Sequence, residues 1–287
     1  MIPSVFEYHA PSTVSEALSL LGQYGDGAKL LAGGHSLLPM MKLRFAEPAH
    51  LIDLNKIREL SGIREEGGVI KIGAMTSETA LIDSALLQKK IPLLVEAASL
   101  IADPQVRNRG TIGGDITHGD PGNDHPAITI ALDAKFILVG PKGERTVAAG
   151  DFFLGTYMTD LQPEEILKEI HIKPFAPKTG SAYCKLKRKT GDFATAAAAV
   201  VLQMSGDVVS SARITLTNVG PIALHAQAAE QALVGKPLTD ASIAAAAAAA
   251  MAICDPAEDL RGNIEYKTAM AGEMTKRAIR LAATRCK

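Results

Sequence analysis

Ala32-Gly33-Gly34-His35-Ser36 and Thr111-Ile112-Gly113-Gly114-Asp115 share one pattern, a Gly-Gly pair between a small or hydroxyl residue and a polar one. Glycine lets a ligand approach main-chain N–H groups closely. Consecutive free N–H groups form a concave anion site, and Ser36 and Thr111 add hydroxyl donors. Two such loops facing each other would suit a diphosphate. A single Gly-Gly pair is more typical of a tight turn, so the prediction depends on the two segments being matched.

The first segment ends a short apolar run, Leu30-Leu31-Ala32, which predicts a buried strand. Before it, Thr13 to Glu16 has the capping-box pattern and opens a helix with apolar residues at helical spacing. After it, residues 51–54 predict a second strand. The sequence therefore begins with a compact β-α-β unit over about residues 1–57.

The second segment lies in a long Gly-, Asp-, Asn- and Pro-rich stretch, residues 103–126, which we interpret as an irregular functional loop. Around it, the sequence predicts a second unit over residues 58–177. Its expected elements are hairpins at 62–73 and 136–147, helices at 78–87 and 93–102, and a strand at 166–172.

Pro174, Pro177 and Gly180 predict a boundary between a first domain, residues 1–177, and a second, residues 178–287. Residues 182–187, 196–204 and 208–217 read as strands, the last two joined by the hairpin signal Ser205-Gly206-Asp207. Helices are expected at 226–234, 241–253 and 266–285. The fold class is α+β: two α/β sub-units, then an antiparallel sheet with helices.

Composition excludes several classes of function. The chain has 287 residues and a formal charge of −1, and 4% of its residues are aromatic with no Trp, which favours neither nucleic acid nor an anionic membrane as a partner. Its three cysteines are far apart, which argues against a disulfide framework, an iron–sulfur site or a zinc site. No secretory signal or apolar span of membrane length is evident, so we expect a cytoplasmic protein.

Other candidate sites are weaker. The chain has no G-x-G-x-x-G motif opening a helix, and Pro237 after Gly235-Lys236 breaks a P-loop, so a Rossmann or P-loop nucleotide site is disfavoured. Residues 118–125 contain His, Asp and Asn, which are residue types that bind metals, but the need for turns explains Asp and Asn here equally well. His35 is expected to bond the backbone of its own loop. The basic run 185–189 is expected to be a solvated face, with docking or cofactor contact as the alternative. No spacing supports hydrolysis, and we predict no catalytic residue.

The two glycine segments, together with residues 101–107 (IADPQVR), resemble the FAD-binding signatures of the flavoprotein subunits of molybdenum hydroxylases. The stretch 185–199 (KLKRKTGDFATAAAA) is similar to the carbon monoxide dehydrogenase branch of that family, and the resemblance covers essentially the whole chain. Relatives acting on xanthine-, aldehyde- or nicotinate-like substrates share the loops, so they remain the alternative.

The resemblance implies an FAD-binding fold of the vanillyl-alcohol-oxidase (PCMH) type, with FAD extended between the first two sub-units and the C-terminal domain. Main-chain amides of residues 32–36 and 111–115 would hold the diphosphate. Asp124 matches a carboxylate near the adenosine end, and Ile101 matches an apolar residue against the isoalloxazine. The resemblance assigns further positions in the flavin pocket to Leu167, Lys185 and Phe193.

The resemblance also implies partners. A large subunit with molybdenum, copper and molybdopterin-cytosine dinucleotide would oxidise carbon monoxide, and a small subunit with two [2Fe-2S] clusters would pass electrons to FAD in this chain. An external acceptor of quinone type would receive them, in a dimer of heterotrimers associated with the inner face of the membrane.

Two positions depart from the family pattern: Asp115 stands where Asn is frequent, and Phe193 stands where Tyr is frequent. A carboxylate beside a diphosphate is repulsive unless it points away or meets a donor, and loss of the phenol hydroxyl would alter how the flavin is shielded. Two other functions stay open, an assembly scaffold whose glycines only make turns and a stand-alone flavin oxidase.

Overall fold

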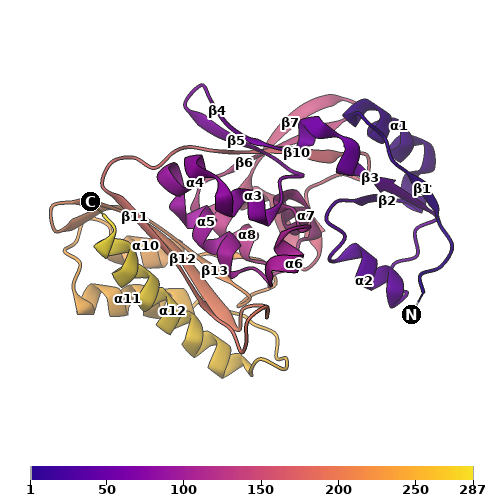
Figure 1. Ribbon diagram of the computed structural model, residues 1–287. Coiled ribbons are helices and arrows are strands. Elements are labelled where there is room, and N and C mark those ends of the chain that lie inside the picture. The colour runs from indigo at the N-terminus through magenta and orange to yellow at the C-terminus, as the bar shows by residue number, and fades with distance from the viewer. Residues whose placement is uncertain (1, 287) are drawn as a thin grey trace.

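The computed structural model describes residues 2–286 and has three main sheets with helices between and around them (Figure 1). The strand orders are β1-β3-β2, β4-β5-β10-β6-β7 and β11-β12-β13-β14, and a separate two-stranded sheet pairs β8 with β9. The predicted α+β class is confirmed. The proposed division into domains 1–177 and 178–287 stays a prediction.

The N-terminal part is a small parallel sheet with two helices. Thr13 begins α1 as predicted, because its hydroxyl accepts a hydrogen bond from the Glu16 amide at 3.1 Å. The Glu16 carboxylate accepts from the Ser12 amide, one residue earlier than the predicted box. The elements are β1 (Glu7–His9), α1 (Val14–Tyr24), β2 (Ala28–Leu31), α2 (Leu37–Lys42) and β3 (His50–Asp53). The sequence interpretation found α1, β2 and β3 and missed β1 and α2.

The central part is an antiparallel sheet covered by short helices. Its strands are β4 (Ile63–Glu66), β5 (Val69–Gly73), β6 (Lys135–Gly140), β7 (Gly143–Ala148) and β10 (Ile166–Ile172). The short pair is β8 (Phe153–Gly155) and β9 (Met158–Thr159). The helices are α3 (Glu78–Asp83), α4 (Ala85–Lys90), α5 (Pro92–Leu100), α6 (Pro104–Arg107), α7 (Ile112–His118), α8 (Asp124–Ala131) and α9 (Ala149–Phe152).

Two predictions in this part were wrong, one of a helix and one of a loop. The single helix expected at 78–87 is broken at Ser84, whose extended backbone and hydroxyl cap begin a new helix at Ala85. The irregular loop expected at 103–126 contains α6, α7 and the start of α8. Asp103 and Thr111 each cap a helix with their side chains, so local capping overcomes the low helix propensity of this glycine-rich stretch.

The C-terminal part is an antiparallel sheet with helices on its outer face (Figure 1). Its strands are β11 (Thr179–Leu186), β12 (Ala196–Ser205), β13 (Val208–Thr217) and β14 (Leu224–His225), and its helices are α10 (Gln227–Leu233), α11 (Asp240–Met251) and α12 (Ile264–Thr284). The predicted strands and helices are all present, with ends shifted by up to three residues. The Ala-rich α11 packs between α10 and α12.

Strand β12 is buried on both faces, which joins this sheet to the central part. Ala198 and Val200 belong to the core shared with α10–α12, whereas Ala197 and Ala199 belong to the core beneath α5 and α8. Successive side chains of a strand point to opposite faces, so a run of alanines allows close packing on both sides. Strand β12 is therefore held in place by packing against a hydrophobic core on each of its two faces. Among the helices described, none is long and apolar enough to cross a membrane.

Candidate cofactor site

A cavity of about 680 Å³ lies where the three parts of the chain meet, a volume typical of small-molecule sites. Fourteen of the predicted cofactor residues line it: Ala32, Gly33, Gly34, His35, Ser36, Ile101, Thr111, Gly113, Gly114, Asp115, Asp124, Leu167, Lys185 and Phe193. Ile112 does not. It is the first residue of α7, and its side chain is completely buried in the core. The structure thus brings together residues from all three sheets.

The first glycine segment lies directly against Arg109 and Gly110, the two residues that precede the second segment, and the closest approach is at Gly33. A side-chain Cβ on Gly33 would lie 2.8 Å from the Cα of Gly110 and would overlap the carbonyl oxygen of Arg109. Gly34 has φ +78°, in the left-handed region that glycine tolerates best. The first segment therefore needs both glycines, one for the close approach and one for its turn.

The free amides of this wall belong to the first segment. Within residues 2–286, the amides of Gly33, Gly34, His35 and Ser36 have no protein acceptor at hydrogen-bonding distance. Gly33 and Gly34 are partly buried and His35 and Ser36 are exposed, and successive free donors beside a cavity suit an anion. His35 itself bonds its own loop, as predicted, with Nδ1 3.0 Å from the Gly33 carbonyl oxygen.

The second segment differs from the expectation, because its amides already have acceptors. The amide of Ile112 donates to Thr76, that of Gly113 to Ala74, and those of Gly114 and Asp115 to the side chain and the carbonyl of Thr111. These bonds begin α7 and attach it to the central sheet. Toward the cavity this segment presents the Thr111 hydroxyl and Gly114, which has no side chain. The prediction that the amides of residues 112–115 are free was wrong.

Gly113 shows why α7 begins there. A Cβ on Gly113 would lie 2.5 Å from the Cβ of Ala74 and 2.6 Å from its carbonyl oxygen. The helix start is therefore pressed against the end of β5, which only glycine permits. This fixes Thr111 and Asp115 on the cavity side.

Asp115 sits in a buried network of charged groups. Its carboxylate accepts from the His125 amide at 3.3 Å, and its pKa is raised to about 7, chiefly because burial disfavours the charged form, with repulsion from Glu78 and Asp124 adding to it. Burial lowers the pKa of His125, but the Glu78 carboxylate, 2.8 Å from Nε2, outweighs this and raises it to about 9. Burial therefore favours the neutral form of the Asp115 carboxyl, which weakens its repulsion of an anion.

Asp124 and Lys185 form a buried ion pair in the cavity wall. One carboxylate oxygen accepts from Lys185 Nζ at 2.6 Å, and the other accepts from the Tyr183 hydroxyl. Lys185 also reaches the carbonyl oxygen of Leu100, at the end of α5. Both charges are compensated, so the pair links β11 to the start of α8 and to α5.

The remaining predicted residues add apolar side chains to the cavity lining. Leu167 lies on β10 and is 3% exposed, and Ile101 follows α5, where its carbonyl accepts from Arg107 at 2.8 Å. Phe193 is 46% exposed and has the Arg261 guanidinium 5.6 Å from its ring centre. The cavity lining thus combines apolar side chains, suited to a flat ring system, with the free amides of residues 33–36.

Two other sequence interpretations are settled by the structure. In the basic run, Lys185 is buried and Lys187 donates to Leu100, so the solvated-face prediction was wrong for both. In the 118–125 loop, Asp120 accepts from the Gly122 amide at 2.8 Å, as the turn interpretation predicts.

Several residues of the site were missed by sequence reasoning. Tyr157, from the β8–β9 turn, and Glu78, from α3, line the cavity. His118 also lines it and contacts the Tyr157 ring. None has a local sequence signal, because each reaches the site only through the tertiary fold.

These features define an α+β cofactor-binding protein whose anion wall is main chain from a glycine loop that has neither the G-x-G-x-x-G nor the P-loop motif. Two family models match the chain: "FAD binding domain in molybdopterin dehydrogenase" over residues 4–175 and "CO dehydrogenase flavoprotein C-terminal domain" over residues 181–282.

Similar proteins agree with these models. The chain is 64% identical, over the full length of both, to the carbon monoxide dehydrogenase medium chain of Hydrogenophaga pseudoflava, and 51% identical, also end to end, to that of Afipia carboxidovorans. A solved carbon monoxide dehydrogenase structure from Hydrogenophaga pseudoflava superposes with a TM-score of 0.99 at 66% identity and full coverage of both chains. This chain belongs to the FAD-binding flavoprotein subunits of molybdopterin dehydrogenases. The predicted family and the predicted cofactor, FAD, are confirmed.

The cavity fits FAD on its own chemistry. The free amides of residues 33–36 suit the diphosphate, the missing Cβ atoms allow close approach, and the apolar side chains of the lining suit a flavin ring.

Proposed function

We propose that this chain is the FAD-binding, electron-transferring medium subunit of a copper- and molybdenum-containing carbon monoxide dehydrogenase. The observation that supports this best is the end-to-end identity of 64% and 51% to two carbon monoxide dehydrogenase medium chains, with no part of the chain left over. A flavoprotein subunit for a xanthine-, aldehyde- or nicotinate-like substrate is the alternative.

The protein's own residues bind and orient the cofactor. The amides of Gly33 to Ser36 and the Thr111 hydroxyl bind the diphosphate, and Asp115, when protonated, adds little repulsion. Ile101, Leu167 and Phe193 provide apolar contacts for the ring system. Bound FAD supplies the redox chemistry, since flavins exchange electrons that these side chains cannot. No residue here acts as an acid or base on a substrate.

The contact of Asp124 with the adenosine end and that of Lys185 with the cofactor stay predictions, and the two side chains also pair with each other. Both oxygens of Asp124 already have partners inside the protein. The pair therefore fixes the wall, joining the C-terminal sheet to the central helices, and Lys185 adds positive charge close to the cofactor. This places the ends of the cavity on a rigid support.

The partners follow from what the chain does not supply. Its cysteines, Cys184, Cys254 and Cys286, are all free and come from separate elements, so in the described part of the chain no thiol cluster can hold iron and sulfur. A small [2Fe-2S] subunit would deliver electrons to FAD, and a large molybdopterin subunit would oxidise carbon monoxide. We extend the proposal to a dimer of heterotrimers in the cytoplasm, at the inner face of the membrane, with a quinone-type acceptor.

The test is to assemble the chain with its two partner subunits and to follow flavin absorbance after addition of carbon monoxide. The proposal predicts flavin bleaching that requires carbon monoxide, and dye reduction that is lost when FAD is removed. Flavin bleaching by xanthine, an aldehyde or nicotinate, and none by carbon monoxide, would establish the alternative. Turnover of a small alcohol by the chain alone would establish a stand-alone oxidase, and an assembled complex without flavin would establish a scaffold.

A further inference from the structure

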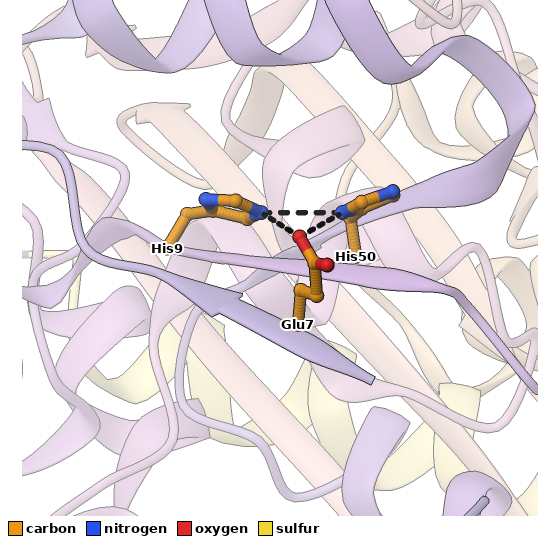
Figure 2. A group of neighbouring side chains, drawn as sticks. All are labelled: Glu7, His9 and His50. Atoms are coloured by element: carbon orange, nitrogen blue, oxygen red, sulfur yellow. Dashed lines mark hydrogen bonds and ion pairs between the residues drawn. The ribbon is translucent and has the colours of Figure 1, made fainter. Parts of the chain in front are cut away.

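Three side chains of the N-terminal sheet meet at one point outside the flavin cavity. Glu7 and His9 are two residues apart on β1, so they point to the same face of the strand. Parallel pairing sets Glu7 opposite His50 of β3, on that same face. Figure 2 shows the carboxylate and both imidazoles turned toward each other. None of the three lines the cofactor cavity.

The distances between their polar atoms match a shared ion better than a chain of hydrogen bonds. His9 Nε2 and His50 Nδ1 are 3.2 Å apart, and Glu7 Oε2 is 3.5 Å from the His50 nitrogen and 4.0 Å from the His9 nitrogen. In a tetrahedral site with bonds of about 2.0–2.1 Å, ligand atoms lie about 3.3–3.4 Å apart. Two of the three distances are within a few tenths of an ångström of this value.

A proton shared between the imidazoles would explain less. It would satisfy the two nitrogens but would leave Glu7 Oε2, at 3.5 and 4.0 Å, beyond hydrogen-bonding range of both. A cation at the common point takes the lone pairs of both nitrogens and the charge of the carboxylate at once. Two neutral imidazoles and one carboxylate form a ligand set that suits a divalent first-row metal such as zinc.

The rings are held in place before any ion arrives. Tyr24, the last residue of α1, stacks on His50 with ring centres 3.7 Å apart and planes 12° apart, and on His9 at 5.0 Å. The two histidine side chains are 20% exposed, and Glu7 is 72% exposed. The site is therefore rigid on its histidine side and open on its glutamate side, which leaves access for an ion and space for a water as fourth ligand.

We propose that Glu7, His9 and His50 form a binding site for a divalent transition metal ion, with zinc as the best match. The ion would tie β1 to β3. Strand β1 is three residues long and pairs with β3 alone among the described strands, so a cross-strand ion would add to a short ladder. The site is independent of the proposed electron-transfer function.

The test uses the full chain purified without a histidine tag and stripped with a chelator. Calorimetric titration with ZnCl₂ should give one ion per chain, and Co²⁺ should produce the visible absorption of a tetrahedral site. His9→Ala and His50→Ala should each weaken zinc binding by more than about tenfold. Glu7→Gln, which keeps the shape of the side chain, should weaken zinc binding and change the Co²⁺ spectrum.

His171→Ala is the matched control, because His171 is similarly exposed at 23% and has a carboxylate partner but no second histidine. It should bind zinc as the unmodified chain does. Equal binding by all variants would assign the zinc to thiols or to scattered surface groups and overturn the proposal. Absence of stoichiometric binding by the unmodified chain would overturn it as well. Circular dichroism of each variant separates loss of the site from loss of the fold.

Discussion

Gly33→Ala tests whether the close approach of the first glycine segment to Arg109 and Gly110 makes the flavin site. The new Cβ would lie 2.8 Å from the Cα of Gly110, whereas carbon atoms pack at about 3.5–4.0 Å. Gly110 and the first segment must therefore separate by about 0.7–1.2 Å. Such overpacking costs about 1–3 kcal/mol, and the free amides of residues 33–36 move with it.

We expect FAD to bind about 10- to 100-fold more weakly, which corresponds to about 1.4–2.8 kcal/mol. The assay is titration of the apoprotein with FAD, followed by quenching of flavin fluorescence, and flavin content of the assembled complex. Gly22→Ala is the matched control, because a Cβ there has nothing within 4 Å and the residue is exposed on α1. It should leave FAD binding unchanged and stabilise the helix by up to about 1 kcal/mol.

An unchanged FAD affinity in a folded Gly33→Ala chain would refute the assignment of the diphosphate to this wall. If the variant does not fold, Ser36→Ala serves as the second test, because it removes only a hydroxyl at the cavity and should weaken FAD binding by a smaller factor.

Three further predictions concern buried charge. The pKa of Asp115 is raised to about 7 in the folded protein, so folding disfavours the ionised carboxylate. The stability of the protein should therefore fall as the pH rises from about 4 to 7. Asp115→Asn should remove this pH dependence from thermal unfolding. The pKa of His125 is raised to about 9, so its pairing with Glu78 stabilises the fold fully below pH 6.5 and is lost as pH rises through 9; Glu78→Gln should abolish this alkaline loss. Lys185→Met leaves the buried Asp124 carboxylate without its cation and should lower the free energy of unfolding by about 3–5 kcal/mol. Adding Asp124→Asn to this variant should recover much of the lost stability. Equal losses in the single and double variants would contradict the pairing.

The parts of the site that could be predicted from sequence are those where a side chain is absent. A glycine in the sequence already shows that a Cβ is absent. Gly33 and Gly113 occupy positions where a Cβ would overlap neighbouring atoms, and Gly34 has a positive φ. The strand at 166–172 was predicted with its actual ends, because its apolar residues alternate over one continuous run. Local chemistry of this kind needs no knowledge of distant partners.

What could not be predicted depends on residues far apart in the chain. The carboxylate of Asp124 meets Tyr183 and Lys185 about sixty positions away, and Glu78 meets His125 across forty-seven positions. A pattern within a window cannot contain such pairs. The same limit explains the error over the basic run, since nothing near Lys185 and Lys187 indicates that acceptors on α5 and α8 turn them inward.

The helix at Ile112–His118 was missed for a different reason. Two consecutive glycines lower helix propensity by about 1 kcal/mol each, so the local pattern favours a loop. Thr111 offsets part of this through its cap, and contact with Ala74 requires glycine at residue 113. Tertiary packing thus selects a helix that local propensity opposes. The hydrogen bonds of this helix and its attachment use the amides that a loop would have left free.

Because α7 uses these amides, the free amides that suit an anion come from the first segment, which follows a strand of the smallest of the three main sheets. Residues 33–36 follow β2, an edge strand that pairs with β3 alone in the described sheet. Asn55, which follows β3, also holds the loop. Its side-chain amide donates to the Ala32 carbonyl oxygen at 3.0 Å and to the Asp53 carboxylate at 2.6 Å. Flavin affinity should therefore respond to the order of β2 and β3 even when nothing at the cavity changes, because free donors contribute to binding only when their geometry is fixed beforehand.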